Sequence, residues 1–226
     1  MIEATMKEKV KEFIVKNFKW IILFICLIGF LAIAENVFNK EIMNGDIVGY
    51  KLISTFLISD FATPIAKFIT NFGDAIFLTV LTIILFILIK NKKIGLSIFF
   101  NLVIITALNQ LLKNILQRPR PTEYRIIEET GYSFPSGHSM ISMAFYGYII
   151  YLIYKYVKNK YIKWISIVLL SILICSIGIS RIYLGVHYTS DVLGGFLISV
   201  SYLVIYISAV IKSFVLWNNC EQKMGR

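Results

Sequence analysis

The sequence predicts an all-α integral membrane protein, a single domain over residues 1–226 that is built as a six-helix bundle. Hydrophobic residues make up 58% of the chain, and the mean hydropathy is +0.75. Charged residues make up only 16%, compared with about 25% in soluble domains. Several apolar runs approach the ~20 residues that a helix needs to cross a bilayer. These three observations argue against an ordinary soluble domain.

The first predicted span is the apolar run Trp20–Ala34, extended by residues 36–38. It follows a polar segment, residues 1–19, whose lysines are typical of a cytoplasmic N-terminus. The same run could be a signal peptide, because it has a positive flank and an Ala-Ile-Ala cleavage pattern at residues 32–34. We favour an uncleaved span.

Residues 39–71 mix charged residues with short apolar groups, which predicts an interfacial segment on the extracytoplasmic side of the membrane. Five longer apolar runs follow, and a polar stretch separates the second of these from the third. The remaining predicted spans are residues 74–89, 94–112, 139–157, 162–180 and 192–217.

The basic residues predict the orientation. Most of the 23 lysines and arginines fall on the side of the two termini, so the positive-inside rule places both termini in the cytoplasm. The net charge of +10 does not predict nucleic-acid binding, because no basic stripe with interleaved aromatic residues is present. We therefore expect a multi-pass protein of the cell membrane whose spans three to six end in an outward-facing site.

The three cysteines, Cys26, Cys175 and Cys220, show no paired spacing. We interpret them as small packing residues and not as disulfides or metal ligands.

Three polar segments lie between the apolar runs, at the outward ends of predicted spans. They are residues 113–121, 134–138 and 180–191, and they contain both histidines of the protein. The candidate site residues within them are Lys113, Arg120, Ser136, Gly137, His138, Arg181, His187 and Asp191.

The cations Lys113, Arg120 and Arg181 predict an anion site. Cations at membrane depth are costly unless they face a partner, and the arginine fork suits phosphate oxygens. Ser136 and Gly137 precede a span, so that helix would direct free N–H groups at the same anion, and glycine allows a close approach.

Some of the basic residues have a simpler interpretation. Lys113 could instead extend its side chain to the membrane surface. Arg118 and Arg125 are interpreted as ordinary loop charges.

The histidines predict acid–base or nucleophilic chemistry. His187 and Asp191 are four residues apart, so one helical turn can place them together. A carboxylate on one ring nitrogen fixes the tautomer and leaves the other nitrogen free to react. Asp191 is also a plausible N-cap of the last span. A zinc site is the alternative, but the neighbouring cations argue against it, so we expect neither metal nor cofactor.

These residues fit three blocks. Lys-x6-Arg-Pro is matched at residues 113–121, Pro-Ser-Gly-His at residues 135–138, and Ser-Arg-x5-His-x3-Asp at residues 180–191. In these blocks the sequence resembles the type 2 phosphatidic acid phosphatase family of membrane lipid phosphatases. The blocks cover residues 113–191, which we regard as the catalytic motif region, and the predicted spans extend the resemblance over most of the chain.

The resemblance implies a metal-independent reaction on a lipid phosphate in the bilayer, with no obligatory protein partner. His187 would attack phosphorus and form a phosphohistidine, Asp191 would orient His187, and His138 would protonate the leaving oxygen. The other five candidates would hold the phosphate oxygens. Undecaprenyl diphosphate and phosphatidylglycerophosphate are the first candidate substrates, and phosphatidic acid is the next. A haloperoxidase-like vanadate site and an anion transporter or channel remain as alternatives.

Overall fold

The computed structural model describes residues 2–40 and 42–224, with side chains at residues 8, 12, 13, 15–40 and 42–213. The described residues form eight helices and no strand. In chain order the helices are α1 (Ile2–Phe38), α2 (Asn44–Leu57), α3 (Ala62–Asn71), α4 (Ala75–Leu88), α5 (Lys92–Leu116), α6 (Gly137–Tyr156), α7 (Lys160–Tyr183) and α8 (Thr189–Met224). The predicted all-α class is confirmed.

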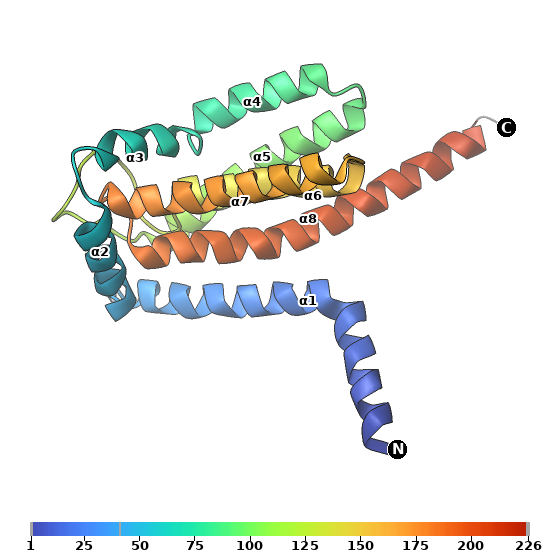
Figure 1. Cartoon of the computed structure of the whole chain (residues 1–226), viewed down its shortest axis with the longest axis horizontal. Helices are drawn as coiled ribbons and strands as arrows, with labels where there is room; N and C mark the ends of the chain where they lie inside the picture. Colours follow the sequence, from blue (N-terminus) through green and yellow to red (C-terminus); the bar gives the residue numbers. More distant parts are fainter. Residues whose placement is uncertain (1, 41, 225–226) are drawn as a thin grey trace.

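The long helices run side by side, and α6 packs against α5, α7 and α8 (Figure 1). On the outside of this group α1 lies along α8, α4 along α5, and α3 along α7. Helix α2 lies across one end of the bundle, whereas α1 begins and α8 finishes at the opposite end (Figure 1).

Four helical segments are long and apolar enough to cross a membrane: Val15–Phe38, Lys92–Leu116, Lys160–Tyr183 and Thr189–Ser213. They contain most of the predicted spans one, three, five and six. Helices α3 and α4 pass the same test only together, as a pair bent by 50°. The described helices therefore give four spans, or five with the bent pair, where the sequence predicted six.

The two remaining predicted spans differ from the others for physical reasons. Residues 74–89 form a helix of only 14 residues, α4, which needs α3 to reach across a bilayer. Residues 139–157 belong to α6, whose buried residues include Ser139, Ser142 and Tyr146. A buried helix can carry such polar groups when they form hydrogen bonds, as Tyr146 does with the carbonyl oxygen of Phe72 and Ser142 does within its own helix.

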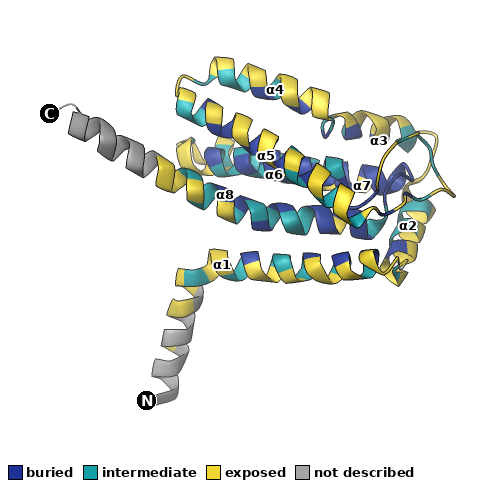
Figure 2. Cartoon of the chain, turned by 180° about the vertical axis from the view of Figure 1, so that it is seen from behind, coloured by how far each residue is buried: buried dark blue, intermediate teal, exposed yellow. Residues whose placement is uncertain are grey.

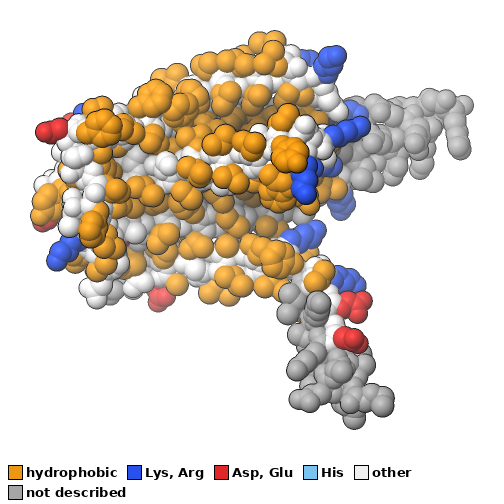
Figure 3. Space-filling model, viewed as in Figure 1, with side chains coloured by type: hydrophobic (Ala, Val, Ile, Leu, Met, Phe, Trp, Pro, Cys, Tyr) orange, Lys and Arg blue, Asp and Glu red, His pale blue; other side chains and the backbone are white. Residues whose placement is uncertain are grey.

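The core lies between α4, α5, α6, α7 and α8. Ile98 and Ile105 of α5, Ala144 of α6 and Ile177 of α7 are each at most 1% exposed. Exposed residues cover the outer faces of α1, α4 and α5 (Figure 2). On the opposite face, which Figure 3 shows in the view of Figure 1, hydrophobic side chains also dominate, with lysines and arginines near the ends, as expected for a surface that faces lipid.

Two of the cysteines can be placed. Cys26 is half-buried, Cys175 is exposed, and both are free thiols. Cys220 lies outside the residues whose side chains are described.

Candidate functional site

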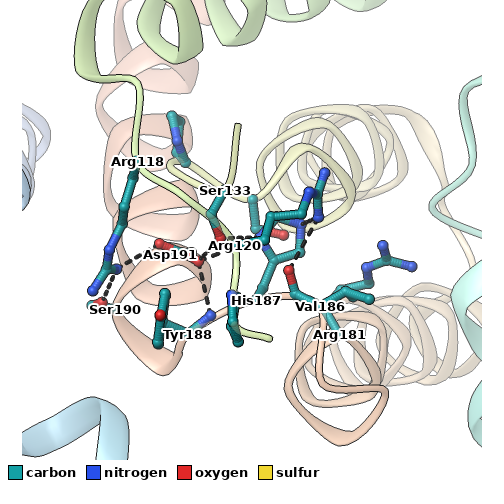
Figure 4. Close-up of polar contacts among 12 residues, drawn as sticks. Arg118, Arg120, Ser133, Arg181, Val186, His187, Tyr188, Ser190 and Asp191 are labelled. Atoms are coloured by element: carbon teal, nitrogen blue, oxygen red, sulfur yellow. Dashed lines mark hydrogen bonds and ion pairs between the residues drawn. The ribbon is translucent and has the colours of Figure 1, made fainter. Parts of the chain in front are cut away.

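The three predicted segments meet at the end of the bundle that α2 crosses. The end of α5 and the loop over residues 117–136 lead into α6, and residues 184–188 connect α7 to α8. Figure 4 shows the polar side chains of these segments gathered in one cluster.

Ser136 is the N-cap of α6. Its Oγ accepts hydrogen bonds from the backbone N–H of Ser139 (3.5 Å) and from the Ser139 hydroxyl (3.0 Å). The backbone N–H of Ser136 donates to the carbonyl oxygen of Asp191 at 3.1 Å, which joins the start of α6 to the start of α8. At Gly137 a Cβ atom would lie 3.2 Å from Oδ1 of Asn109, so the position is closely packed.

His187 lies between a carboxylate and a guanidinium. Its Nδ1 is 3.4 Å from Oδ2 of Asp191 and 3.3 Å from the hydroxyl of Ser133. Its Nε2 is 3.1 Å from Nη1 of Arg120. Burial lowers the pKa of His187 to about 4, even though Asp191 acts in the opposite direction. A neutral ring with its proton on Nδ1 fits these contacts, because Nε2 can then accept a hydrogen bond from Arg120.

The Asp191 carboxylate is fully buried and divides its contacts between its two oxygens. Oδ1 accepts a hydrogen bond from Arg118 (2.7 Å). Oδ2 accepts from the Ser133 hydroxyl and from the backbone N–H of Tyr188 (2.8 Å). Because α8 begins at Thr189, Asp191 is the third residue of the helix and reaches back to the N-cap, Tyr188. The prediction that Asp191 is itself the N-cap is wrong.

The interpretation of Arg118 as an ordinary loop charge is also wrong. Its side chain is only 5% exposed and forms ion pairs of 2.7 Å with Asp191 and with Asp46 of α2. Arg125 differs, because it is partly exposed and pairs with the solvent-facing Glu128 at 3.8 Å.

Arg120 is held mainly by backbone oxygens. It donates to the carbonyl groups of Gly131 (3.0 Å), Thr130 (2.9 Å) and Val186 (3.1 Å). These bonds fix the guanidinium next to Nε2 of His187.

Arg181 is 1% exposed and is connected to Arg120 through Glu129, which contacts both side chains. Its Nη1 donates to the Thr70 hydroxyl (2.9 Å), its Nη2 donates to Glu129 (2.5 Å), and its buried Nε has no partner among the described residues. The second Glu129 oxygen is 3.9 Å from Arg120. Burial raises the pKa of the Glu129 carboxyl, but Arg181 and Arg120 more than offset this and hold the pKa below its usual value. A carboxylate thus bridges two of the predicted phosphate-binding arginines.

Lys113 and His138 complete the predicted set. The Lys113 ammonium donates to the carbonyl oxygen of Tyr132 at 2.6 Å, so it contacts the loop over the site. The His138 ring packs against Gly73 in the break between α3 and α4, where a Cβ atom would lie 3.2 Å from its Cδ2. Within the described part of the chain, His138 forms no hydrogen bond through its ring.

Sequence reasoning missed three residues whose side chains contact the predicted set, Thr70, Glu129 and Ser133. It also missed Asp46, which contacts Arg118. Glu129 and Ser133 lie in the polar stretch between two predicted blocks, so their position was a usable signal. Asp46 and Thr70 lie in residues 39–71, far from the blocks, and the sequence gives no sign of their contacts.

A cavity of about 690 Å³ lies beside this cluster, between α2 and residues 121–124, and His187 is part of its wall. Much of the remaining wall is apolar or aromatic, with Ile42, Ile47, Tyr50 and Tyr124. The rings of Tyr50 and Tyr124 stack with their centroids 4.9 Å apart. No group of three or more His, Cys, Asp or Glu side chains suited to a metal ion occurs within the described residues.

Comparison with known proteins agrees with the geometry. The family model described as the PAP2 superfamily matches residues 94–214, slightly more than half of the chain. A phosphatidylglycerophosphatase B of Bacillus subtilis is 40% identical over 90 residues, which are 39% of this chain and 44% of that protein. The matching part thus spans less than half of that relative's length.

Two further matches cover more of the chain. An undecaprenyl-diphosphatase of Sulfolobus acidocaldarius is 27% identical over 208 residues, which are 86% of this chain and 93% of that protein. Among solved structures, a transmembrane PAP2-type phosphatidylglycerolphosphate phosphatase from Bacillus subtilis aligns with a TM-score of 0.74 at 27% identity. That alignment covers 84% of this chain and 96% of the other.

Proposed function

Because this chain belongs to the PAP2 superfamily, we propose that it is a metal-independent lipid phosphatase that works through a phosphohistidine intermediate. The observation that carries the proposal is the environment of His187. Nδ1 of this buried ring is 3.4 Å from the Asp191 carboxylate, and Nε2 is 3.1 Å from Arg120, one of several cations in the site. This arrangement is the one expected of an imidazole nucleophile beside a phosphate site.

In the first step Nε2 of His187 attacks phosphorus. An N–P bond forms, and the bond between phosphorus and the leaving oxygen breaks. Asp191, on Nδ1, orients the ring and stabilises the positive charge that develops on it. His138 donates a proton to the leaving oxygen, which departs as a lipid alcohol or, from a diphosphate, as a lipid monophosphate.

In the second step water attacks phosphorus and the N–P bond breaks. His138 now accepts the proton from the water, so each side chain returns to its starting form and inorganic phosphate is released. No step requires a metal ion, because Lys113, Arg120 and Arg181 supply the positive charge that the phosphate oxygens need.

The phosphate oxygens would be held by these three cations and by the backbone at Ser136 and Gly137. The N-terminus of α6 adds free N–H groups and the positive end of the helix dipole. Glu129 now bridges Arg120 and Arg181, so a bound phosphate would compete with this carboxylate for the two guanidinium groups.

The substrate class is a phosphate ester or diphosphate of a membrane lipid. The apolar cavity next to His187 and the lipid-facing flank of the bundle support an amphiphilic substrate. The names of the relatives make undecaprenyl diphosphate and phosphatidylglycerophosphate the first candidates. Phosphatidic acid, which the resemblance of the sequence blocks suggests, is the next.

We also propose that six segments cross the membrane: α1, the bent pair α3–α4, α5, α6, α7 and α8. The site then lies at the extracytoplasmic end, with α2 in the interface above it and both termini in the cytoplasm. The excess of basic residues on the side of the termini supports this orientation.

The proposal is tested by measuring phosphate release from purified protein in detergent. The panel should contain undecaprenyl diphosphate, phosphatidylglycerophosphate and phosphatidic acid, each assayed with and without EDTA. We expect turnover of at least one lipid that EDTA leaves largely unchanged. Absence of turnover on every lipid, together with anion flux in liposomes, would favour an anion transporter instead.

A further inference from the structure

We propose that Arg118 and Asp46 are positioning residues for this reaction: Arg118 fixes the Asp191 carboxylate so that one oxygen faces His187, and Asp46 fixes Arg118. The inference rests on the proposed role of His187 and Asp191. Arg118 occupies an unspecified position of the first sequence block, and Asp46 lies outside all three blocks. Figure 4 shows Asp191 between Arg118 on one side and His187 on the other.

The two oxygens of the Asp191 carboxylate have different partners. Its Oδ1 accepts from Nη1 of Arg118 at 2.7 Å, whereas its Oδ2 is the oxygen near Nδ1 of His187. A carboxylate anchored through one oxygen by a charged donor cannot rotate without breaking a short, strong hydrogen bond. Arg118 therefore sets the direction in which Oδ2 points, and through it the tautomer of His187.

Arg118 is itself held in place by several contacts. Its Nη2 donates to Oδ2 of Asp46 (2.7 Å), its Nη1 also donates to the Ser190 hydroxyl (2.7 Å), and its guanidinium lies 4.1 Å from the ring centroid of Tyr188. Two carboxylates and an aromatic face fix the plane of the guanidinium, which a lysine ammonium could not reproduce.

The charge of Asp46 compensates for the charge of Arg118 near His187. Arg118 alone would weaken the negative potential with which Asp191 stabilises a positive His187 ring. Asp46 is 3% exposed, and its charge offsets that of Arg118, so the Asp46–Arg118–Asp191 group keeps a net negative charge beside His187. The pair thus orients Asp191 without neutralising its effect.

Asp46 also links α2 to the site. Oδ1 of Asp46 accepts from the backbone N–H of Ser190 at the start of α8, at 2.8 Å. Asp46 therefore ties α2 both to Arg118 and to the helix that carries Asp191. A helix that lies across the end of the bundle becomes part of the support of the nucleophile.

The kinetic test compares Arg118→Gln, Arg118→Lys, Asp46→Asn and the double variant Asp46→Asn/Arg118→Gln. We expect Arg118→Gln to lower kcat about 10- to 100-fold, as is typical when the support of an active-site group is lost. The inhibition constant of inorganic phosphate should stay within about 3-fold, because Arg118 does not touch the phosphate site. Arg118→Lys should recover only part of the activity.

The double variant tests whether Asp46 acts through Arg118. It should match Arg118→Gln within about 2-fold, whereas independent residues would give multiplied losses. Arg125→Gln and Asp60→Asn are the matched controls, since both residues lie outside the cluster, and neither should change kcat. Equal loss of kcat and of phosphate affinity in Arg118→Gln, or multiplied losses in the double variant, would overturn the proposal.

A second measurement does not depend on activity. The chain has only two histidines, so the ¹⁵N spectrum of histidine-labelled protein in detergent can be assigned with a His138→Gln variant. We expect His187 to be protonated on Nδ1 in the unchanged protein and to show mixed tautomers in Arg118→Gln and Asp46→Asn. Unchanged His187 signals in both variants would refute the positioning role. Lack of turnover by the unchanged protein would refute the proposed function alone.

Discussion

At the scale of single residues, the two histidines have different surroundings. His187 is buried, with partners at both nitrogens, whereas His138 packs against Gly73 and forms no ring hydrogen bond within the described residues. A fixed ring suits a nucleophile, which must attack from one direction. A ring without fixed partners suits an acid, which must meet leaving oxygens of different substrates.

The first prediction separates these roles. His187→Ala and His138→Ala should both lose most activity on a lipid monophosphate, but only His138→Ala should regain activity on p-nitrophenyl phosphate. Nitrophenolate leaves without a proton, whereas general acid catalysis contributes about 10²–10⁴-fold for a poor leaving group. The ratio of kcat/KM on the two substrates measures the difference. Equal recovery in both variants would mean that the roles are assigned wrongly.

The second prediction concerns Glu129, which bridges Arg181 and Arg120. Glu129→Gln should lower the inhibition constant of inorganic phosphate by roughly 2- to 5-fold, the value expected from losing one partly exposed competing ion pair. The control is Glu128→Gln, since that side chain is 91% exposed and pairs with Arg125 at the surface. Weaker phosphate binding in Glu129→Gln would show that the carboxylate supports the site instead of competing for it.

At the scale of helices, the sequence locates the helices better than it shows which of them can cross a membrane alone. The runs in α1, α5, α7 and α8 are continuous and apolar because much of their surface contacts lipid, so hydropathy identifies them. Helix α6 is surrounded by protein, and helices α3 and α4 are separated by a bend. Neither a buried polar face nor a bend appears in a hydropathy pattern.

The site follows the same logic. The eight candidate residues come from three short blocks, whose residue spacing can be recognised in the sequence alone. Arg118 was misread although it stands two residues before Arg120, because burial depends on α2, which packs over it from a distant part of the chain. Contacts such as Asp46 with Arg118 and Thr70 with Arg181 exist only after the helices assemble.

The third prediction concerns the bend between α3 and α4. A Cβ atom at Gly73 would lie 2.8 Å from Cγ2 of Ile177 and 3.2 Å from the His138 ring, so Gly73→Ala should displace His138. We expect kcat on a lipid monophosphate to fall about 10-fold or more, since misplacing a catalytic group by about 1 Å can cost up to 100-fold. Activity on p-nitrophenyl phosphate should fall less.

Gly45→Ala is the matched control, because a Cβ atom there meets nothing within 4 Å. An equal fall on both substrates in Gly73→Ala would point to a general packing defect and not to His138.

At the scale of the whole molecule, the site and the two ends of the chain lie at opposite ends of the bundle (Figure 1). The fourth prediction follows from the proposed orientation. With the native cysteines replaced by serine, Glu128→Cys should react with an impermeant maleimide added to intact cells, because this position is exposed and lies beside the site. Labelling that occurs only after permeabilisation would reverse the orientation.

In the proposed reaction a histidine, and not a metal-activated water, attacks the lipid phosphate. The most direct measurement is a rapid quench in alkaline detergent of the protein with ³²P-labelled lipid phosphate in EDTA, followed by mapping of any labelled residue at alkaline pH. We predict an acid-labile phosphoryl group on His187, present in His138→Ala supplied with a substrate whose leaving group needs no proton, and lost in His187→Ala. Turnover that EDTA abolishes and zinc or magnesium restores, with no labelled histidine at any quench time, would contradict the account.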